Sequence, residues 1–434
     1  MPWIVERSDN ISWERLAALM AETAAQARQR LCARPRRVLL LPPDITRAHS
    51  GAGRLTEMLY HDFASEAEVH VIPTLGQHVP HTRSENVRMF GSIPEDRIHP
   101  HDWRGGCVQV GEISGDEVAA ATGRKVSWPI PISLNARLMQ EPWDLVINVG
   151  HVVPHEVLGF ANHNKNYFIG LGGKDLICAS HMAAACCGIE NNLADLVTPV
   201  RHCFNLAEER YLGALPDLYV QLVMARTPAG HLVHTGVHVG DDLDTYLGAA
   251  RQSRQQNITL FEQPLRKIVC VMDDEFASTW VANKAVYRTR MALADGGELL
   301  IIAPGLRRFG EQPDVDRLIR RYGYTGTTRV MEQYRTERDL QDLAHATAHL
   351  IHGSSEGRFK VTYAPGHLGR QELEQVGLGY ADLAEAMNRY RPASQSEGWA
   401  RTTDGEEFFF IPTPSAGLWS TRAKLGGRLQ DKTA

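Results

Sequence analysis

The chain has 434 residues, which at roughly 150 residues per domain is enough for two or three domains, each with its own hydrophobic core. Its 46 Lys and Arg against 51 Asp and Glu give a net charge of −5, and no dense basic run could follow a phosphate backbone, so we expect no nucleic-acid partner. The first residues lack a basic segment followed by an apolar one, and nowhere do about 18 apolar residues run together. We therefore expect a soluble, cytoplasmic protein that binds no membrane.

The cysteines and the histidines of the sequence support different inferences. Seven cysteines stand at scattered positions without a Cys-x-x-Cys pair, which argues for reduced thiols and against a zinc ribbon. The 19 histidines are the outlier of the composition. Several fall close together in the sequence, namely His78 and His81, then His151, His155 and His163, then His181.

The first half of the chain alternates amphipathic helices with short apolar strands. Apolar residues on one face predict a helix over 11–31. The same patterns then predict strands over 37–41, 69–73 and 144–149 and helices over 55–63 and 84–90.

The second half repeats this alternation. It predicts strands over 267–272, 298–303, 359–363 and 407–411 and helices over about 280–294 and 371–389. Strands alternating with helices are typical of parallel βαβ units in doubly wound sheets. We expect two α/β domains with mostly parallel sheets and an active-site cleft between them. A polar stretch over 252–264 favours an N-terminal domain of 1–258 and a C-terminal domain of 259–434.

Polar side chains follow three of the predicted strands. Ligands of open α/β sheets bind beyond the carboxyl ends of the strands, so these segments are candidate sites. They read Asp44-Ile45-Thr46-Arg47, then Gly76-Gln77-His78-Val79-Pro80-His81, then His151 to His155 continuing to Lys165. We expect the three segments to share one cleft.

Each segment also has a plainer interpretation. Asp44 and Thr46 fit a side-chain-capped turn, and His78 and His81 fit an exposed loop. The spacing of His151 and His155 is that of two zinc ligands on one helical turn, but the intervening Pro154 opposes a regular helix.

The glycine-rich segment 170–173 before Lys174 does not have the spacing of a phosphate-binding loop, because Phe168 and Asp175 stand where Gly and Ser or Thr are needed. It predicts a tight turn. No Gly-x-Gly-x-x-Gly follows a strand, which disfavours a nicotinamide dehydrogenase.

Taken in order, these motifs resemble those of the lactate racemase family. The Asp-x-Thr-Arg turn, the Gly-x-His-x-Pro segment, and a His followed by Gly-Phe and then Lys all occur at matching positions. A further His lies sixteen residues beyond that Lys, and a later Lys precedes a Gly-Gly pair. The matching residues are Asp44 to Arg47, Gly76 to Pro80, His155 with Gly159, Phe160 and Lys165, then His181, and Lys284 before Gly296.

The resemblance implies a nickel-pincer nucleotide, Ni pyridinium-3,5-bisthiocarboxylic acid mononucleotide, as cofactor. Lys165 would hold it covalently, His181 would be the protein's ligand to the nickel, and Asp44 and Thr46 would belong to the cofactor site. Enzymes of cofactor biosynthesis would then be partners during maturation. A neutral imidazole suits a nickel ion that also has soft sulfur donors.

The resemblance also implies a racemase or epimerase of a 2-hydroxy acid, an isomerase acting by proton-coupled hydride transfer through a 2-keto acid. His78 and His155 would be the paired acid and base, since an imidazole can exchange a proton at neutral pH. Arg47 would bind the carboxylate in two-pronged fashion and Lys284 would add charge near the substrate oxygens.

The sequence departs from the lactate enzymes around the substrate. Trp280 and Val281 stand where a Tyr-Gln pair is expected, and Gln77 replaces an aromatic residue beside His78. With Gln77 and Trp280 as substrate contacts, the pocket favours a polyhydroxylated sugar acid such as an aldonate. The further polar candidates are His81, His151, Asn162 and His163.

Two alternatives stay open. A divalent-metal hydrolase or lyase would use the cluster of His151, His155 and His163, and a non-catalytic protein would simply bind a small acid in the same cleft.

Overall fold

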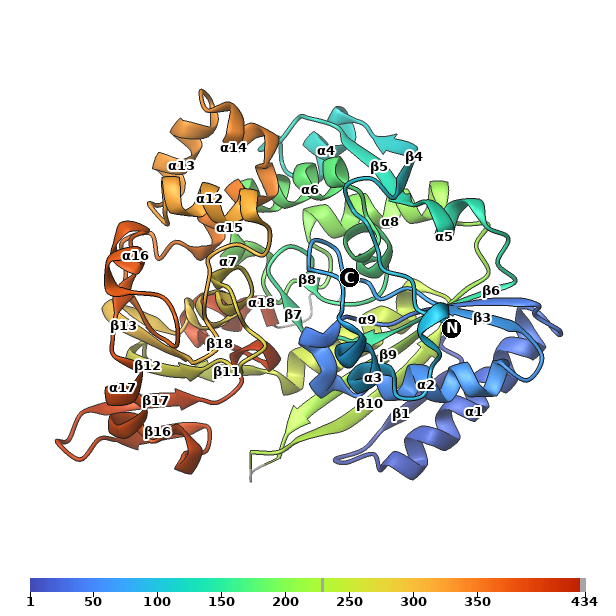
Figure 1. Cartoon of the computed structure of the whole chain (residues 1–434), viewed down its shortest axis with the longest axis horizontal. Helices are drawn as coiled ribbons and strands as arrows, with labels where there is room; N and C mark the ends of the chain where they lie inside the picture. The colour runs from blue at the N-terminus through green and yellow to red at the C-terminus, as the bar shows by residue number, and fades with distance from the viewer. Residues whose placement is uncertain (228–229, 430–434) are drawn as a thin grey trace. The chain divides into compact units, whose positions relative to one another are not determined.

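The computed structural model describes residues 1–227 and 230–429 (Figure 1). They divide into two compact units. Unit 1 contains the described residues within 1–187, 192–227 and 231–256, and unit 2 contains 188–191, Gly230 and 257–429. Within the described residues, no helix is both long enough and apolar enough to cross a membrane.

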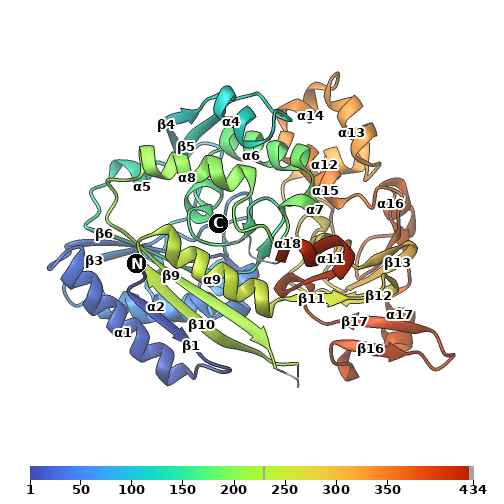
Figure 2. The same cartoon turned by 180° about the vertical axis from the view of Figure 1, so that it is seen from behind.

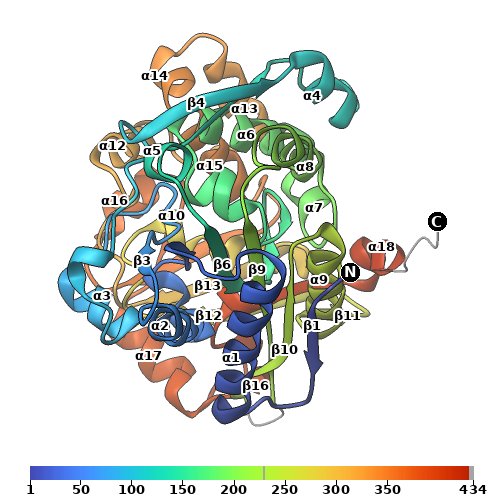
Figure 3. The ribbon, with the colours of Figure 1, turned by 90° about the vertical axis from the view of Figure 1, so that its right-hand side faces the viewer.

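Unit 1 is built on a six-stranded sheet (Figure 3). Its strands, in spatial order, are β1 (Ile4–Arg7), β10 (Leu232–Gly240), β9 (Asp217–Arg226), β6 (Leu145–His151), β2 (Arg37–Leu41) and β3 (Glu68–Val71). The last four run parallel, whereas β10 is antiparallel to β9 and to β1. The carboxyl ends of β6, β2 and β3 therefore meet at one edge of the sheet.

Both faces of this sheet are covered, which explains why β2 is apolar from Val38 to Leu41. Val38 and Leu40 pack on one face and Leu39 and Leu41 on the other, and all four side chains are fully buried. Burial of each such side chain stabilises the fold by about 1.5–3 kcal/mol.

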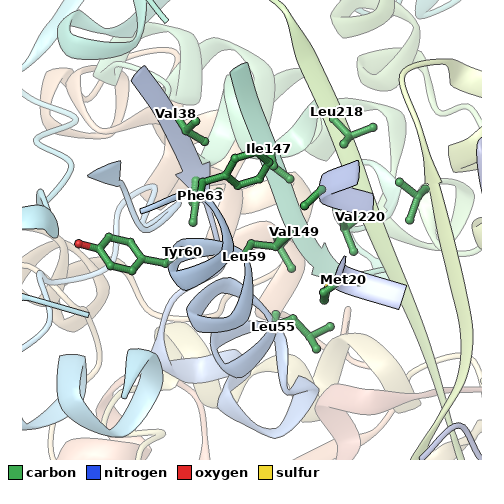
Figure 4. Close-up of a cluster of buried hydrophobic side chains, with 14 of the residues drawn as sticks. Met20, Val38, Leu55, Leu59, Tyr60, Phe63, Ile147, Val149, Leu218 and Val220 are labelled. Carbon is green, nitrogen blue, oxygen red and sulfur yellow. The ribbon is translucent and has the colours of Figure 1, made fainter. Parts of the chain in front are cut away.

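Helices α1 (Trp13–Arg30) and α2 (Ala52–Phe63) cover the first face. Figure 4 shows Met20, Leu55 and Leu59 beside Ile147 and Val149 of β6. The second face packs against α6 (Lys174–Cys187), α8 (Pro199–Tyr211) and the hairpin of β4 (Cys107–Ile113) and β5 (Ile130–Asn135). Figure 2 shows α9 (Leu243–Gln256) lying along β9 and β10, which it contacts.

The remaining elements of unit 1 are short. They are η1 (Ile45–Ser50), α3 (Arg83–Phe90), η2 (Glu95–Arg97), α4 (Gly115–Ala121), α5 (Ala136–Gln140), β7 (Pro154–His155), β8 (Gly159–Phe160) and η3 (Asn166–Gly170). Helix α7 (Ile189–Asn192) starts with residues that belong to unit 2.

Unit 2 has its own six-stranded sheet, in the order β15 (Gly379–Tyr380), β14 (Lys360–Pro365), β13 (Leu293–Ala303), β12 (Leu265–Val271), β17 (Glu407–Ile411) and β16 (Gly398–Arg401). Every neighbouring pair is parallel except β16 with β17. A separate parallel pair joins β11 (Ile258–Phe261) to β18 (Leu418–Thr421).

The helices of unit 2 are α10 (Thr279–Ala282), α11 (Lys284–Thr289), α12 (Pro313–Tyr322), α13 (Thr327–Tyr334), α14 (Arg338–Asp342), α15 (Ala344–Gly353), α16 (Arg370–Gln375), α17 (Leu383–Tyr390) and α18 (Gly427–Leu429), with shorter turns η4 (Pro392–Ser394), η5 (Pro414–Ala416) and η6 (Arg422–Gly426). Helix α17 packs through Ala386 and Tyr390 on the face of the sheet that carries Val269 and Ile302.

The predicted fold class, two α/β parts with mostly parallel sheets, is confirmed. Two predicted helices are wrong in extent. The helix over 280–294 breaks at Asn283 and ends at Thr289, because β13 already begins at Leu293. The helix over 371–389 is two helices, because Gly377 at a φ of +84° turns the chain into β15.

Candidate active site

The end of β2 and the end of β3 are joined by a carboxylate. Asp44 precedes η1, is 5% exposed, and accepts a hydrogen bond from Thr46 Oγ1 at 2.7 Å. Its other oxygen is hydrogen-bonded to Nδ1 of His78, which lies after β3. An ionised carboxylate only accepts, so in the neutral ring of His78 the proton is on Nδ1 and the lone pair is on Nε2. The carboxylate of Asp44 is thus held by Thr46 and orients His78.

His81 holds the same turn in place. Its Nε2 accepts the backbone N–H of Ile45 at 2.9 Å, and its Nδ1 is 3.1 Å from Oδ1 of Asn86. Both ring nitrogens are thereby used within unit 1. His81 thus supports the turn that follows Asp44, and its contact with substrate stays a prediction.

The turn before His78 is pressed against the segment that follows Lys165. Gly76 has a φ of +57° and its N–H donates to the carbonyl of Gly170 at 2.9 Å. The next residue, Gln77, is 7% exposed, and its Nε2 finds no hydrogen-bond partner among the residues described. An unpaired buried amide costs about 1–3 kcal/mol, so a group that accepts from Gln77 would be bound favourably.

His155, at the end of β7, has the opposite tautomer to His78. Its Nδ1 accepts the backbone N–H groups of Val157 at 3.2 Å and Leu158 at 3.4 Å, so the proton of the neutral ring is on Nε2. That Nε2 lies 3.8 Å from a carboxylate oxygen of Glu156. His78 therefore presents a lone pair and His155 presents an N–H.

Glu156 is a site residue that the sequence reasoning missed. Its side chain is 17% exposed, and its charge acts on Arg47, whose pKa is lowered by burial and raised by Asp44 and Glu156. The only sequence signal was a carboxylate directly after a candidate catalytic histidine. A guanidinium offers five N–H donors and no acceptor, so Arg47 is suited to pair with a carboxylate.

Lys165 and His181 lie in the same neighbourhood. Lys165 precedes η3, a short π-helical turn of the kind that often marks functional sites, and His181 lies on α6. The Nδ1 of His181 donates to the carbonyl of Ile177 at 2.9 Å, which leaves the lone pair on Nε2.

Burial lowers the pKa of His181 to about 4, with smaller contributions from Glu156, which raises it, and from Lys165, which lowers it. A neutral imidazole with Nε2 available is a proper nickel ligand, so Lys165 and His181 fit the group that the motifs imply.

Asn162 and His163, next to Lys165, serve the loop itself. Both have left-handed backbones, with φ of +67° and +59°. Asn162 donates to the carbonyl of Gly150 at 3.1 Å and accepts from Asn166 at 2.7 Å. His163 is 2% exposed, with its ring stacked on Tyr219 at 4.2 Å, and burial lowers its pKa to about 4. Their contact with substrate stays a prediction.

The metal-hydrolase hypothesis finds no support in the described residues, where no three His, Cys, Asp or Glu side chains are arranged to hold a metal ion. His151 ends β6 with its ring edge-on to His49, whereas His163 is stacked on Tyr219. As Pro154 predicted, no helix joins His151 to His155.

The glycine segment before α6 is a packed turn, as predicted. A Cβ on Gly172 would lie 2.0 Å from the carbonyl oxygen of Phe168, and one on Gly173 would lie 2.3 Å from Oγ of Ser133. Close approach to protein atoms, not to a phosphate, explains these glycines.

Trp280 and Lys284 lie in unit 2, and their role toward substrate stays a prediction. Trp280 of α10 stacks on His349 of α15 with ring centroids 4.5 Å apart. Nδ1 of His349 is 2.7 Å from the hydroxyl of Tyr287 and Nε2 is 2.8 Å from that of Tyr324. The ring that supports Trp280 is thus fixed at both nitrogens.

Unit 1 is therefore an α/β domain in which two histidines of opposite tautomer, a lysine and a third histidine follow the ends of the strands. Residues 11–191 match the family model of the lactate racemase N-terminal domain. Over this part of the chain the match bears out the lactate racemase family that the motifs indicated.

Solved structures agree with the fold. A structural-genomics protein from Thermotoga maritima is 22% identical, with a TM-score of 0.81 over 96% of this chain and 100% of that one. The lactate racemase apoprotein from Thermoanaerobacterium thermosaccharolyticum is 14% identical, with a TM-score of 0.64 over 96% and 94%. A comparison with curated proteins gives no match.

Proposed function

We propose that the protein is an isomerase that inverts C2 of a 2-hydroxy acid with the help of a nickel-pincer nucleotide. Family membership supports a racemase or epimerase function. The observation that carries the proposal is that the Asp44–His78 pair, His155, and the Lys165 and His181 pair all lie within the matched domain.

Lys165 and His181 would hold the cofactor, Lys165 through its amine and His181 through Nε2. When bound, the cofactor supplies a hydride acceptor and donor for the α-hydrogen. The protein supplies the proton transfers and the position of the substrate.

The hydroxyl proton of one epimer passes to Nε2 of His78, and Asp44 stabilises the resulting imidazolium through Nδ1. In that direction the Nε2–H of His155 donates a hydrogen bond to a substrate oxygen, and the proton held on Nε2 of His78 returns to the substrate oxygen when the keto acid is reduced on its other face. In the opposite direction His155 acts as the base, after its proton has moved to Nδ1.

Arg47 would bind the substrate carboxylate in competition with Asp44 and Glu156. The buried amide of Gln77 adds a donor for a further hydroxyl group. Together they support a polyhydroxylated acid such as an aldonate as the substrate.

The test is a panel of 2-hydroxy acids, lactate and aldonates included, offered to protein co-expressed with the cofactor biosynthesis enzymes and analysed by chiral chromatography. We expect epimer formation from at least one polyhydroxylated acid, retention of deuterium from 2-deuterated substrate, and loss of turnover in His78→Ala. An acid that binds without inversion would instead make the protein a binding protein.

A further inference from the structure

Arg201 is a fully buried cation beneath the loop that carries Lys165. It lies in the first turn of α8, 0% exposed, with its guanidinium 4.5 Å from the centre of the Tyr246 ring. Burying a cation costs several kcal/mol unless its donors are satisfied. An apolar side chain at this buried position of α8 would have a smaller free-energy cost of burial, so the presence of a charge needs an explanation.

The two terminal nitrogens of Arg201 donate to one short segment, whereas its Nε has no hydrogen-bond partner in the described part of the chain. Its NH2 group donates to the carbonyl of Phe160 at 2.6 Å, and its NH1 group donates to the carbonyl of Asn162 at 3.3 Å and to Oδ1 of Asn164. All three acceptors fall within the five residues before Lys165. They include the left-handed Asn162, whose unusual backbone needs such support.

Asn164, which directly precedes Lys165, completes the arrangement. It is 0% exposed, and its Nδ2 donates to Asn205 at 2.7 Å and to Glu208 at 2.9 Å, both on α8. Its amide thus joins the buried Arg201 to Glu208 with every donor and acceptor used. Helix α8 therefore holds the segment before Lys165 through two sets of contacts, those of Arg201 and those of Asn205 and Glu208 with Asn164.

We infer that Arg201, acting through Asn164, is a positioning residue that sets where the Lys165 amine is held and thereby controls attachment of the cofactor. The inference rests on the proposed role of Lys165. A displacement of about 1 Å at a reacting group can cost up to about a hundredfold in rate, so such a clamp has a measurable effect.

The test compares Arg201→Met with Arg210→Met, a matched change on the same helix that removes only an exposed ion pair with Glu117. The first readout is hydrogen exchange of the cofactor-free protein over 158–168, where the amides of Ala161, Asn166 and Phe168 are hydrogen-bonded. We expect exchange to quicken at least about tenfold in Arg201→Met and to stay unchanged in Arg210→Met.

The second readout is the rate at which the Lys165 adduct appears by intact mass during maturation. We expect it to fall about 10–100-fold in Arg201→Met, with partial recovery in Arg201→Lys. If Arg201→Met does not fold, Asn164→Ser tests the same contacts with the charge in place, and we expect faster exchange and slower adduct formation.

Unchanged exchange and unchanged adduct formation in folded Arg201→Met or Asn164→Ser would overturn the inference. Absence of any adduct in the wild-type protein would overturn the proposed function instead, and hydrogen exchange alone would then decide whether Arg201 fixes the loop.

Discussion

At the scale of single residues, the chemistry depends on which nitrogen of each histidine carries a proton. Asp44 fixes the proton of His78 on Nδ1, whereas two backbone amides fix that of His155 on Nε2. The two rings are chemically different before any substrate binds, although they are the same residue type.

Asp44→Asn should lower kcat by roughly 10²–10⁴-fold with a small change in KM, because an amide neither stabilises the imidazolium nor enforces the tautomer. Thr46→Val removes the hydrogen bond from Thr46 but leaves the carboxylate in place, so it separates the effect of that bond from the effect of the charge. Steady-state epimerisation kinetics decide the matter. A kcat within a few-fold of wild type in Asp44→Asn would exclude Asp44 as the partner of His78.

Arg47→Lys should raise KM for the acid roughly tenfold or more, because an ammonium cannot reproduce two parallel hydrogen bonds to a carboxylate. Arg54→Lys on α2 is a control, since Arg54 lies over the ring of Trp13. An unchanged KM in Arg47→Lys would remove Arg47 from the carboxylate site.

At the scale of elements, periodicity predicted the strands and helices whose apolar faces are regular, and β2 and β17 occur with the predicted bounds. The antiparallel hairpin of β9 and β10 was not predicted, because burial on both faces removes the alternation that marks a hairpin strand.

The candidate site was predictable where motifs place residues at strand ends. Arg201 and Glu208 were not, because nothing in the pattern of α8 distinguishes a buried charge from an exposed one.

The buried carboxyl group of Asp217, at the start of β9, should make the stability of the fold depend on pH. Burial, with the charge of Glu208, raises the pKa of Asp217 to about 7. The folded protein therefore keeps a proton that the unfolded chain loses near pH 4, and this group makes stability fall as pH rises from about 4 to 7, by at most ~1.4 kcal/mol per pH unit.

Asp217→Asn removes this titration while the amide oxygen can still accept from Tyr167. The melting temperature of the variant relative to wild type should therefore increase between pH 5 and pH 8. A difference in melting temperature that does not vary with pH would contradict the raised pKa.

In unit 2, Tyr324→Phe should lower the melting temperature by about 2–4 °C for each kcal/mol lost, because it leaves Nε2 of His349 without its hydroxyl partner. Fluorescence of Trp280, which stacks on His349, should change as well. Tyr380→Phe, at a partly exposed position, is the control. Equal melting temperatures in the two variants would show that the hydroxyl of Tyr324 contributes nothing to stability.

At the scale of the whole molecule, two α/β units divide the chain, and the residues proposed to carry the cofactor and the proton transfers all come from unit 1. The many histidines of the chain have different roles. His78 and His155 are proposed for proton transfer and His181 for nickel, while His81, His163 and His349 hold loops and rings in place.

The most direct test is the intact mass and nickel content of the chain after co-expression with the cofactor biosynthesis enzymes. The account predicts a nickel-pincer adduct on the Lys165 peptide with about one nickel per chain, no adduct in Lys165→Ala, and an adduct with reduced nickel in His181→Ala. A chain of unmodified mass without nickel would contradict it.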